Sequence, residues 1–145
     1  MRYTARIEQT YKYRKRMKYI AETDEFIEKD CDSLAYVRGV KQPYGWLTES
    51  GTPPQPHLDV YIMTDREFEL GDRVPVTIIG VFFRCDGDHK LVGVTDDRDI
   101  TDLSQLTDSE KADLHRLYSG KYEGEEWLGA EAAKKVIDEF FESME

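Results

Sequence analysis

Residues 74–95 read Val-Pro-Val-Thr-Ile-Ile-Gly-Val-Phe-Phe-Arg-Cys-Asp-Gly-Asp-His-Lys-Leu-Val-Gly-Val-Thr, and the predicted architecture is built around them. Both ends of this segment are rich in β-branched and aromatic residues, which favour strands. Between them stands Asp86-Gly87, a strong hairpin signal because glycine adopts the positive φ of a tight turn without strain. We therefore predict one strand on each side of this turn. A further apolar strand at 58–64 completes a predicted β meander over 58–95.

The segments on either side of the meander differ in pattern. Residues 1–20 alternate loosely between tyrosines and basic side chains, which indicates extended segments. Later, Thr107-Asp-Ser-Glu110 fits a capping box that opens a helix ending near Gly120. Apolar residues then recur at helical spacing over 129–144. Because strands come first and helices last, we predict an α+β fold in which two helices cover an antiparallel sheet or small barrel.

Length and composition bound the class of protein. The chain has 145 residues, which suits a single domain, predicted to span 1–145. It is 39% hydrophobic and 12% aromatic, as expected of a chain that folds. The longest apolar run, residues 76–83, is too short to cross a bilayer, and two cysteines without a secretory leader fit a reducing compartment. We expect a soluble, cytoplasmic protein with no membrane partner.

Charge is unevenly distributed along the chain. The net charge is −10, yet residues 1–18 contain seven basic side chains and only one acidic side chain, Glu8. The basic and tyrosine-rich segment 11–19 has two readings, an RNA-binding strand or a solvated strand face. Because the rest of the chain is acidic, we do not expect nucleic acid as a partner. One basic surface on an acidic body instead suits a small anion or a metal–anion complex.

A loop over residues 41–60 carries the first group of candidate residues. It contains four of the five prolines of the chain, so it is rigid. A rigid loop can hold Tyr44, His57 and Asp59 in fixed positions for binding, or it can be a plain surface connection. Asp59 directly precedes a buried strand, where a charge needs a metal ion or a cation as its partner.

The predicted hairpin turn carries the second group. Asp86 and Asp88 offer hard oxygen ligands that suit Mg²⁺, and Lys90 can neutralise a phosphate; the alternative is a solvated hairpin tip. Cys85 and His89 supply only half of a zinc tetrahedron. The chain has no Gly-x-Ser-x-Gly elbow, phosphate-binding Gly-rich loop or dinucleotide fingerprint. These absences argue against nucleophilic catalysis by the protein.

Several segments, taken in order, resemble the soluble family I inorganic pyrophosphatases. They are Tyr44-Gly-Trp-Leu, Leu58-Asp-Val, Gly71-Asp, Ile79-Gly-Val, Asp88-His-Lys-Leu-Val-Gly-Val, Asp102-Leu-Ser-Gln-Leu, and Trp127 followed by Ala130-Glu-Ala-Ala-Lys. The resemblance covers most of residues 7–141. It implies an OB-like five-stranded β-barrel with two flanking C-terminal helices, often assembled as a homo-oligomer, that hydrolyses pyrophosphate with Mg²⁺.

The resemblance also implies roles for individual residues. Asp59, Asp86 and Asp88 would bind Mg²⁺. His57 stands where the family has a proline, so its role is not carried over from the family. In a divergent hydrolase its ordinary pKa, near neutrality, would let it act with Asp59 in catalysis by deprotonating the attacking water. The phosphate groups of the substrate would contact Lys18, Tyr44, Lys90 and Tyr118. Glu8 resembles an early acidic residue of the family's metal shell, and Arg38 is a candidate for its phosphate-binding arginine.

The chain departs from the family at its signature, Asp-x-Asp-Pro-x-Asp-Val. Here the corresponding stretch is Pro54-Gln-Pro-His-Leu-Asp-Val60, so two of the three aspartates are replaced by proline. A proline side chain neither binds a metal ion nor accepts a proton. Two functions therefore stay open. The first is a divergent Mg²⁺-dependent hydrolase that cleaves pyrophosphate or a related diphosphate with metal-activated water. The second is a catalytically inactive module of the same fold that binds a phosphate-bearing ligand or a protein partner.

Overall fold

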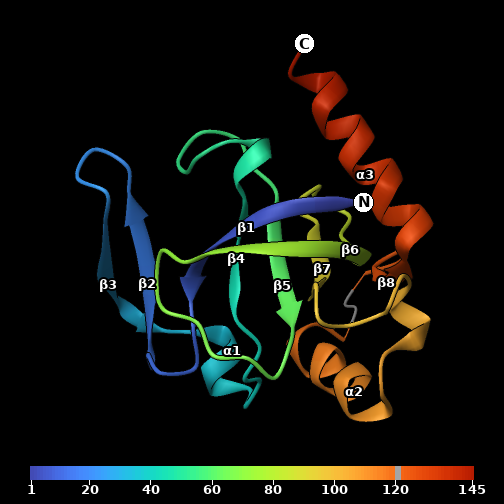
Figure 1. Ribbon diagram of the computed structural model, residues 1–145, viewed down its shortest axis with the longest axis horizontal. Coiled ribbons are helices and arrows are strands. Elements are labelled where there is room, and N and C mark those ends of the chain that lie inside the picture. Colours follow the sequence, from blue (N-terminus) through green and yellow to red (C-terminus); the bar gives the residue numbers. More distant parts are fainter. Residues whose placement is uncertain (120–121) are drawn as a thin grey trace.

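A five-stranded barrel forms the body of the protein, in a computed structural model that describes residues 1–119 and 122–145 (Figure 1). The barrel strands are β1 (Arg2–Gln9), β4 (Tyr44–Leu47), β5 (Asp59–Met63), β6 (Arg73–Phe83) and β7 (Lys90–Thr95). They follow the order β1-β4-β5-β7-β6, and pairing of β1 with β6 closes the barrel. Strand β8 (Glu126–Gly129) extends the sheet beyond β6.

The remaining elements surround the barrel. They are a hairpin of β2 (Lys15–Ile20) and β3 (Glu25–Asp32), the helices α1 (Leu34–Val37), α2 (Asp108–Leu117) and α3 (Ala130–Ser143), and the short 3-10 helices η1 (Thr48–Ser50) and η2 (Leu103–Gln105). Figure 1 shows the β2–β3 hairpin on one side of the barrel and α2 and α3 on the other. The predicted α+β barrel with two flanking C-terminal helices is confirmed. No helix among the described residues has the length and apolarity needed to cross a membrane.

Local signals in the sequence are reproduced at the helices. Thr107 accepts a hydrogen bond from the backbone N–H of Glu110, and the Glu110 carboxylate accepts one from Thr107 in return, which confirms the predicted capping box. Helix α2 ends at Leu117, and the predicted end near Gly120 lies outside the described residues. The predicted turn at Asp86-Gly87 is also confirmed, since Gly87 has φ 83° and the turn joins β6 to β7.

The predicted meander is wrong in its strand order. β5 pairs in parallel with β7, and β6 lies antiparallel on the far side of β7, so β5 and β6 are not neighbours. A parallel pairing needs a long crossover connection, which local alternation of residue types does not reveal. The same pairing brings together two residues that are distant in sequence, because its register sets Asp59 opposite Lys90 at the start of both strands.

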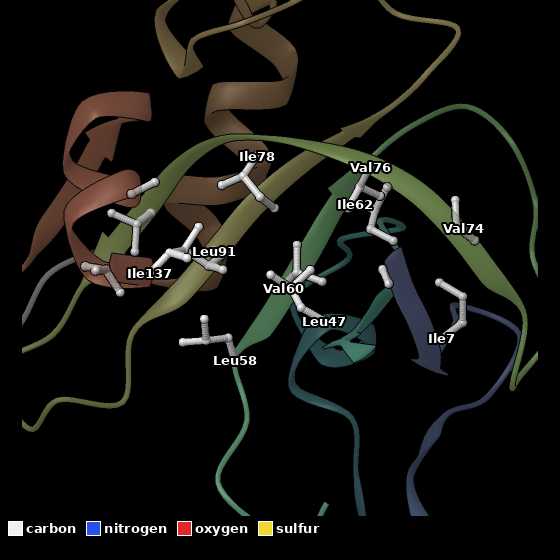
Figure 2. Close-up of a cluster of buried hydrophobic side chains, with 14 residues drawn as sticks. Ile7, Leu47, Leu58, Val60, Ile62, Val74, Val76, Ile78, Leu91 and Ile137 are labelled. Atoms are coloured by element: carbon white, nitrogen blue, oxygen red, sulfur yellow. The ribbon is translucent and has the colours of Figure 1, made fainter. Parts of the chain in front are cut away.

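The core explains why the strands close into a barrel. Figure 2 shows apolar side chains from every barrel strand meeting in one cluster, joined by Ile137 from α3. Because strand side chains alternate between faces, Val60 and Ile62 point into this cluster, while Tyr61 and Met63 belong to a second cluster with Leu114 and Leu117 of α2. Both faces of β5 are therefore buried, and its first residue, Asp59, lies at the mouth of a fixed barrel.

The close contact between β1 and β4 generates a stability prediction. A Cβ added to Gly45 would lie 1.9 Å from the carbonyl oxygen of Arg6, so Gly45→Ala must push the two backbones apart. We expect it to lower the free energy of unfolding by about 1–3 kcal/mol in denaturant titrations. Gly93→Ala is the control, since its Cβ would meet the Val76 side chain at 3.3 Å, and it should cost less. Equal losses of stability in the two variants would contradict this explanation.

Candidate functional site

The Asp59–Lys90 ion pair forms the centre of the candidate site. Lys90 Nζ lies 2.8 Å from Asp59 Oδ2 and 3.1 Å from Asp88 Oδ1, and it also donates to the Tyr44 hydroxyl at 3.4 Å. All three ammonium protons therefore have acceptors. Only 10% of the Lys90 side chain and 14% of the Asp59 side chain are exposed. Burial alone would lower the pKa of Lys90, but the two carboxylates outweigh it and the pKa is raised.

His57 bonds the second carboxylate oxygen of Asp59. Its Nε2 lies 2.9 Å from Asp59 Oδ1, and its Nδ1 lies 2.8 Å from the carbonyl oxygen of Gln55. Both neighbours are acceptors, so both ring nitrogens act as donors and the ring is an imidazolium. The hydrogen bond to Asp59 is the main reason that the pKa of His57 is raised. Both nitrogens of His57 are engaged in this geometry, and its role as the base stays a prediction.

The carboxylates do not fit the predicted Mg²⁺ site. Burial would raise the pKa of Asp59, but the hydrogen bond from His57 and the charge of Lys90 lower it to about 2. Asp88 faces Lys90, and Asp86 lies at the hairpin tip, 3.6 Å from Arg84. Over residues 1–119 and 122–145, no three His, Cys, Asp or Glu side chains are grouped to hold a metal ion. Both carboxylate oxygens of Asp59, which a metal ion would need as ligands, already bond His57 and Lys90.

Two adjoining hollows open above this ion pair. The first, the basic groove, has a volume of about 550 Å³ and is lined by Arg16, Lys18, Lys29, Pro53, Pro54, His57 and Asp59, among others. The second, the tyrosine lobe, has a volume of about 330 Å³ and is lined by Met17, Leu34, Tyr61, Arg84 and Tyr118, among others. Both hollows share Glu8, Arg16, Tyr44, Asp88 and Lys90. They are therefore parts of one continuous depression.

The basic groove is lined by four carboxylates, Glu8, Glu22, Asp59 and Asp88, and by five cations once His57 is protonated, Arg16, Lys18, Lys29, His57 and Lys90. Three of these cations come from one hairpin. Arg16, Lys18 and Lys29 lie on the β2–β3 hairpin and make no ion pair within the described part of the chain. The hairpin is held in place by Tyr19, which is 7% exposed and whose ring lies 5.1 Å from the ring of Trp46 on β4. A fixed hairpin therefore presents three free cations to the groove.

The structure brings most of the predicted site residues together. The basic groove is lined by Lys18, Tyr44, His57, Asp59, Asp88 and Lys90. Tyr118 lines the tyrosine lobe instead, where its hydroxyl lies 3.3 Å from that of Tyr61. Asp86 lines neither hollow.

Other candidates named from the sequence have separate places. Glu8 lines both hollows, and its burial raises its pKa. Arg38 donates to the backbone carbonyl of Leu117 at the end of α2 and lines neither hollow. Cys85 donates to Glu125, while His89 accepts from the backbone N–H of Arg84. These two side chains therefore have different partners.

Sequence reasoning missed three basic residues of the site, Arg16, Lys29 and Arg84. A signal existed for Arg16, because residues two apart in a strand share a face and Lys18 was already a candidate. Assigning Lys29 to the site requires knowing that β3 pairs with β2. Assigning Arg84 requires knowing where the tyrosines of the lobe lie. Both depend on contacts between distant segments.

Comparison with known proteins now identifies the fold. No protein-family model and no curated protein sequence matches the chain. Among solved structures, it is similar to an inorganic pyrophosphatase from Neisseria gonorrhoeae, at 22% identity and a TM-score of 0.76, with 97% of this chain and 89% of that chain covered. The pyrophosphatase from Ehrlichia chaffeensis has 17% identity, a TM-score of 0.71 and 94% and 90% coverage. The pyrophosphatase from Thermus thermophilus has 14% identity and a TM-score of 0.69, with 94% of this chain and 87% of that chain covered. The fold is therefore that of the inorganic pyrophosphatases, an OB-like barrel.

The lowered pKa of Asp59 predicts a stability change with pH. Asp59 has an ordinary pKa of 3.8 and a folded pKa of about 2, which corresponds to about 2 kcal/mol of stabilisation. Because the folded pKa is the lower one, this contribution is complete above about pH 4 and is lost as the pH falls through 2. In denaturant titrations, Asp59→Asn should destabilise the protein at pH 7 and flatten the loss of stability between pH 4 and 2.

Asp138→Asn is the matched control for this measurement. Asp138 pairs with Lys134 on the exposed face of α3, where both side chains are more than half exposed. Exposed pairs of this kind contribute little to stability. The loss of stability of Asp138→Asn between pH 4 and 2 should therefore match that of the unmodified protein. An unchanged slope in Asp59→Asn would show that the buried pair does not carry this stability.

Proposed function

We propose that the chain, as a single pyrophosphatase-like domain over residues 1–145, binds pyrophosphate or a related diphosphate in the basic groove without a metal ion and without hydrolysing it. The observation that carries this proposal is the convergence of Arg16, Lys18 and Lys29, all without ion pairs in the described residues, on the groove floored by Lys90. Homo-oligomeric assembly and a cytoplasmic location stay predictions.

Charge and hydrogen bonding favour a diphosphate as the ligand. Arginine and lysine donate charge-assisted hydrogen bonds to phosphate oxygens, and arginine can do so with two parallel bonds. Lys90 and His57 already neutralise Asp59, so this residue does not repel an anion as a bare carboxylate would. Because the backbones of the hairpin and the barrel are both fixed, binding need order only the exposed side chains of the hairpin cations.

Hydrolysis by a Mg²⁺-dependent mechanism is the second candidate function. It is favoured by the fold and by the presence of Asp59 and Asp88 in the same groove. Cleavage of a diphosphate requires a positioned and deprotonated water as well as neutralised phosphate oxygens. The groove offers cations for the second requirement. For the first, His57 has both nitrogens engaged and Asp59 has both oxygens engaged.

Calorimetry and a phosphate-release assay separate the two functions. We expect pyrophosphate to bind in the presence of EDTA, and Mg²⁺ to weaken this binding, because Mg²⁺ competes with the protein's own cations for the same phosphate oxygens. Mg²⁺ alone should give no binding heat, and no phosphate should be released. Phosphate release that requires Mg²⁺ and disappears in Asp59→Asn would establish the hydrolase. Absence of pyrophosphate binding under both conditions would overturn the proposal.

The role of the hairpin cations is tested separately with Arg16→Gln. A hydrogen bond to a charged group contributes about 1.5–3 kcal/mol, so pyrophosphate affinity should fall about 10-fold or more. Thermal stability should stay unchanged, because Arg16 makes no ion pair within the described residues. Lys135→Gln is the control, since Lys135 is an exposed residue of α3 and lines neither hollow. Equal affinities for the two variants would contradict this prediction.

A further inference from the structure

The tyrosine lobe extends the depression beyond what a diphosphate needs. The lobe has a volume of about 330 Å³, lies next to the basic groove and shares Tyr44 and Lys90 with it. Apolar and aromatic side chains form much of its wall, namely Met17, Leu34, Ala35, Tyr44, Tyr61 and Tyr118. Ligand sites in proteins combine such walls with a few fixed polar groups.

Arg84 lies on the wall of this lobe, where its guanidinium makes only long ion pairs over residues 1–119 and 122–145. Its guanidinium carbon lies 5.4 Å from the centre of the Tyr118 ring. The closest carboxylates, Asp86 and Asp88, are 3.6 and 3.9 Å away, beyond hydrogen-bonding distance. Its Nε is buried without a hydrogen-bond partner in the described residues. The buried Nε cannot be reached from the hollow, but the two terminal nitrogens make only these long ion pairs in the part of the chain that the structure describes. They are the donors that Arg84 can offer to an acceptor on a ligand in the lobe.

The tyrosines add fixed rings and neutral hydroxyl groups. Phe82 stacks on Tyr118 with ring centres 5.0 Å apart, and the Tyr44 and Tyr61 rings lie 4.7 Å apart. Burial raises the pKa values of Tyr44 and Tyr61 well above their ordinary value, so both hydroxyls stay protonated. Rings held in this way offer both contact area and hydrogen bonds at little entropic cost.

The charges of the lobe argue against a longer inorganic polyphosphate. Its cations are Arg16, Arg84 and Lys90, and they are matched by the carboxylates of Glu8, Asp32 and Asp88. The charges of the lobe therefore cancel, whereas the cations of the basic groove exceed its carboxylates by one when His57 is protonated. A phosphate is thus less favoured in the lobe than in the groove. An uncharged, polar group with hydrogen-bond acceptors fits the balance better.

We propose that the ligand is a diphosphate monoester whose diphosphate lies in the basic groove and whose polar, ring-containing organic group lies in the tyrosine lobe beside Arg84. The five residues shared by the two hollows make it possible for one molecule to span both. Nucleoside diphosphates are the probes of choice, because a sugar and a base provide both rings and acceptors. This inference rests on the proposed function, since it places the diphosphate in the same groove.

The test is calorimetry in EDTA with three probes: pyrophosphate, a purine nucleoside diphosphate and a pyrimidine nucleoside diphosphate. We expect at least one nucleoside diphosphate to bind 10-fold or more tightly than pyrophosphate. Arg84→Gln should reduce that preference to less than threefold, and Tyr118→Phe, which keeps the ring, should reduce it in part. Arg73→Gln is the control, because Arg73 lies at the start of β6 and lines neither hollow. Thermal unfolding confirms that each variant is folded.

The outcomes distinguish this inference from the proposed function. If no probe binds, the proposed function fails and the inference fails with it. If pyrophosphate binds and both nucleoside diphosphates bind equally or more weakly, the inference alone is overturned. A preference that survives unchanged in both Arg84→Gln and Tyr118→Phe would place the organic group elsewhere and would also overturn it.

Discussion

The buried ion pair between Asp59 and Lys90 is the constraint on which the rest of the site depends. Each charge lies at the start of a strand, and the parallel register of β5 and β7 fixes them side by side. Removing one partner of a buried pair leaves an uncompensated charge, at a cost of about 3–5 kcal/mol. Because Lys90 also bonds Asp88 and Tyr44, the pair joins the β6–β7 turn and β4 to the same point. The mouth of the barrel is rigid for this reason.

The site consists of two layers, a floor of paired charges and a hairpin above it. In the floor, positive and negative side chains satisfy one another, with His57 and Lys90 on opposite oxygens of Asp59. Above the floor, the β2–β3 hairpin carries cations that have no such partners in the described residues. The hairpin is anchored through Tyr19, which packs on Trp46 and accepts a hydrogen bond from Arg6 at 3.1 Å. The hairpin cations therefore lie above a floor in which the charge of Asp59 is already neutralised.

The sequence predicted the parts of this arrangement that depend on local chemistry. Strands β1, β5, β6 and β7, the capping box at Thr107 and the turn at Gly87 follow from residue preferences along a few positions. The loop predicted over 41–60 is wrong in part, because its residues 44–47 form β4 between β1 and β5. The sequence also showed that Asp59 needs a partner, because it precedes a buried strand. It did not identify Lys90 as that partner, since the register of β5 against β7 depends on a crossover connection. Arg84 was missed because its place beside Tyr118 depends on α2 docking against the barrel.

The likeness to the pyrophosphatases and the chemistry of the mouth have different physical origins. The fold is specified by interior residues such as Val60, Ile62 and Leu91, whose alternation and packing are independent of the residues at the mouth. Residues at the strand ends can therefore change while the barrel is kept, and a fold alone does not define a function. Here Pro54 lines the groove, and the carboxylate of Asp59 bonds two cations of the protein. The same barrel can therefore present a mouth whose buried carboxylate bonds cations of the protein, and this is the feature from which the proposed metal-free binding of a diphosphate is argued.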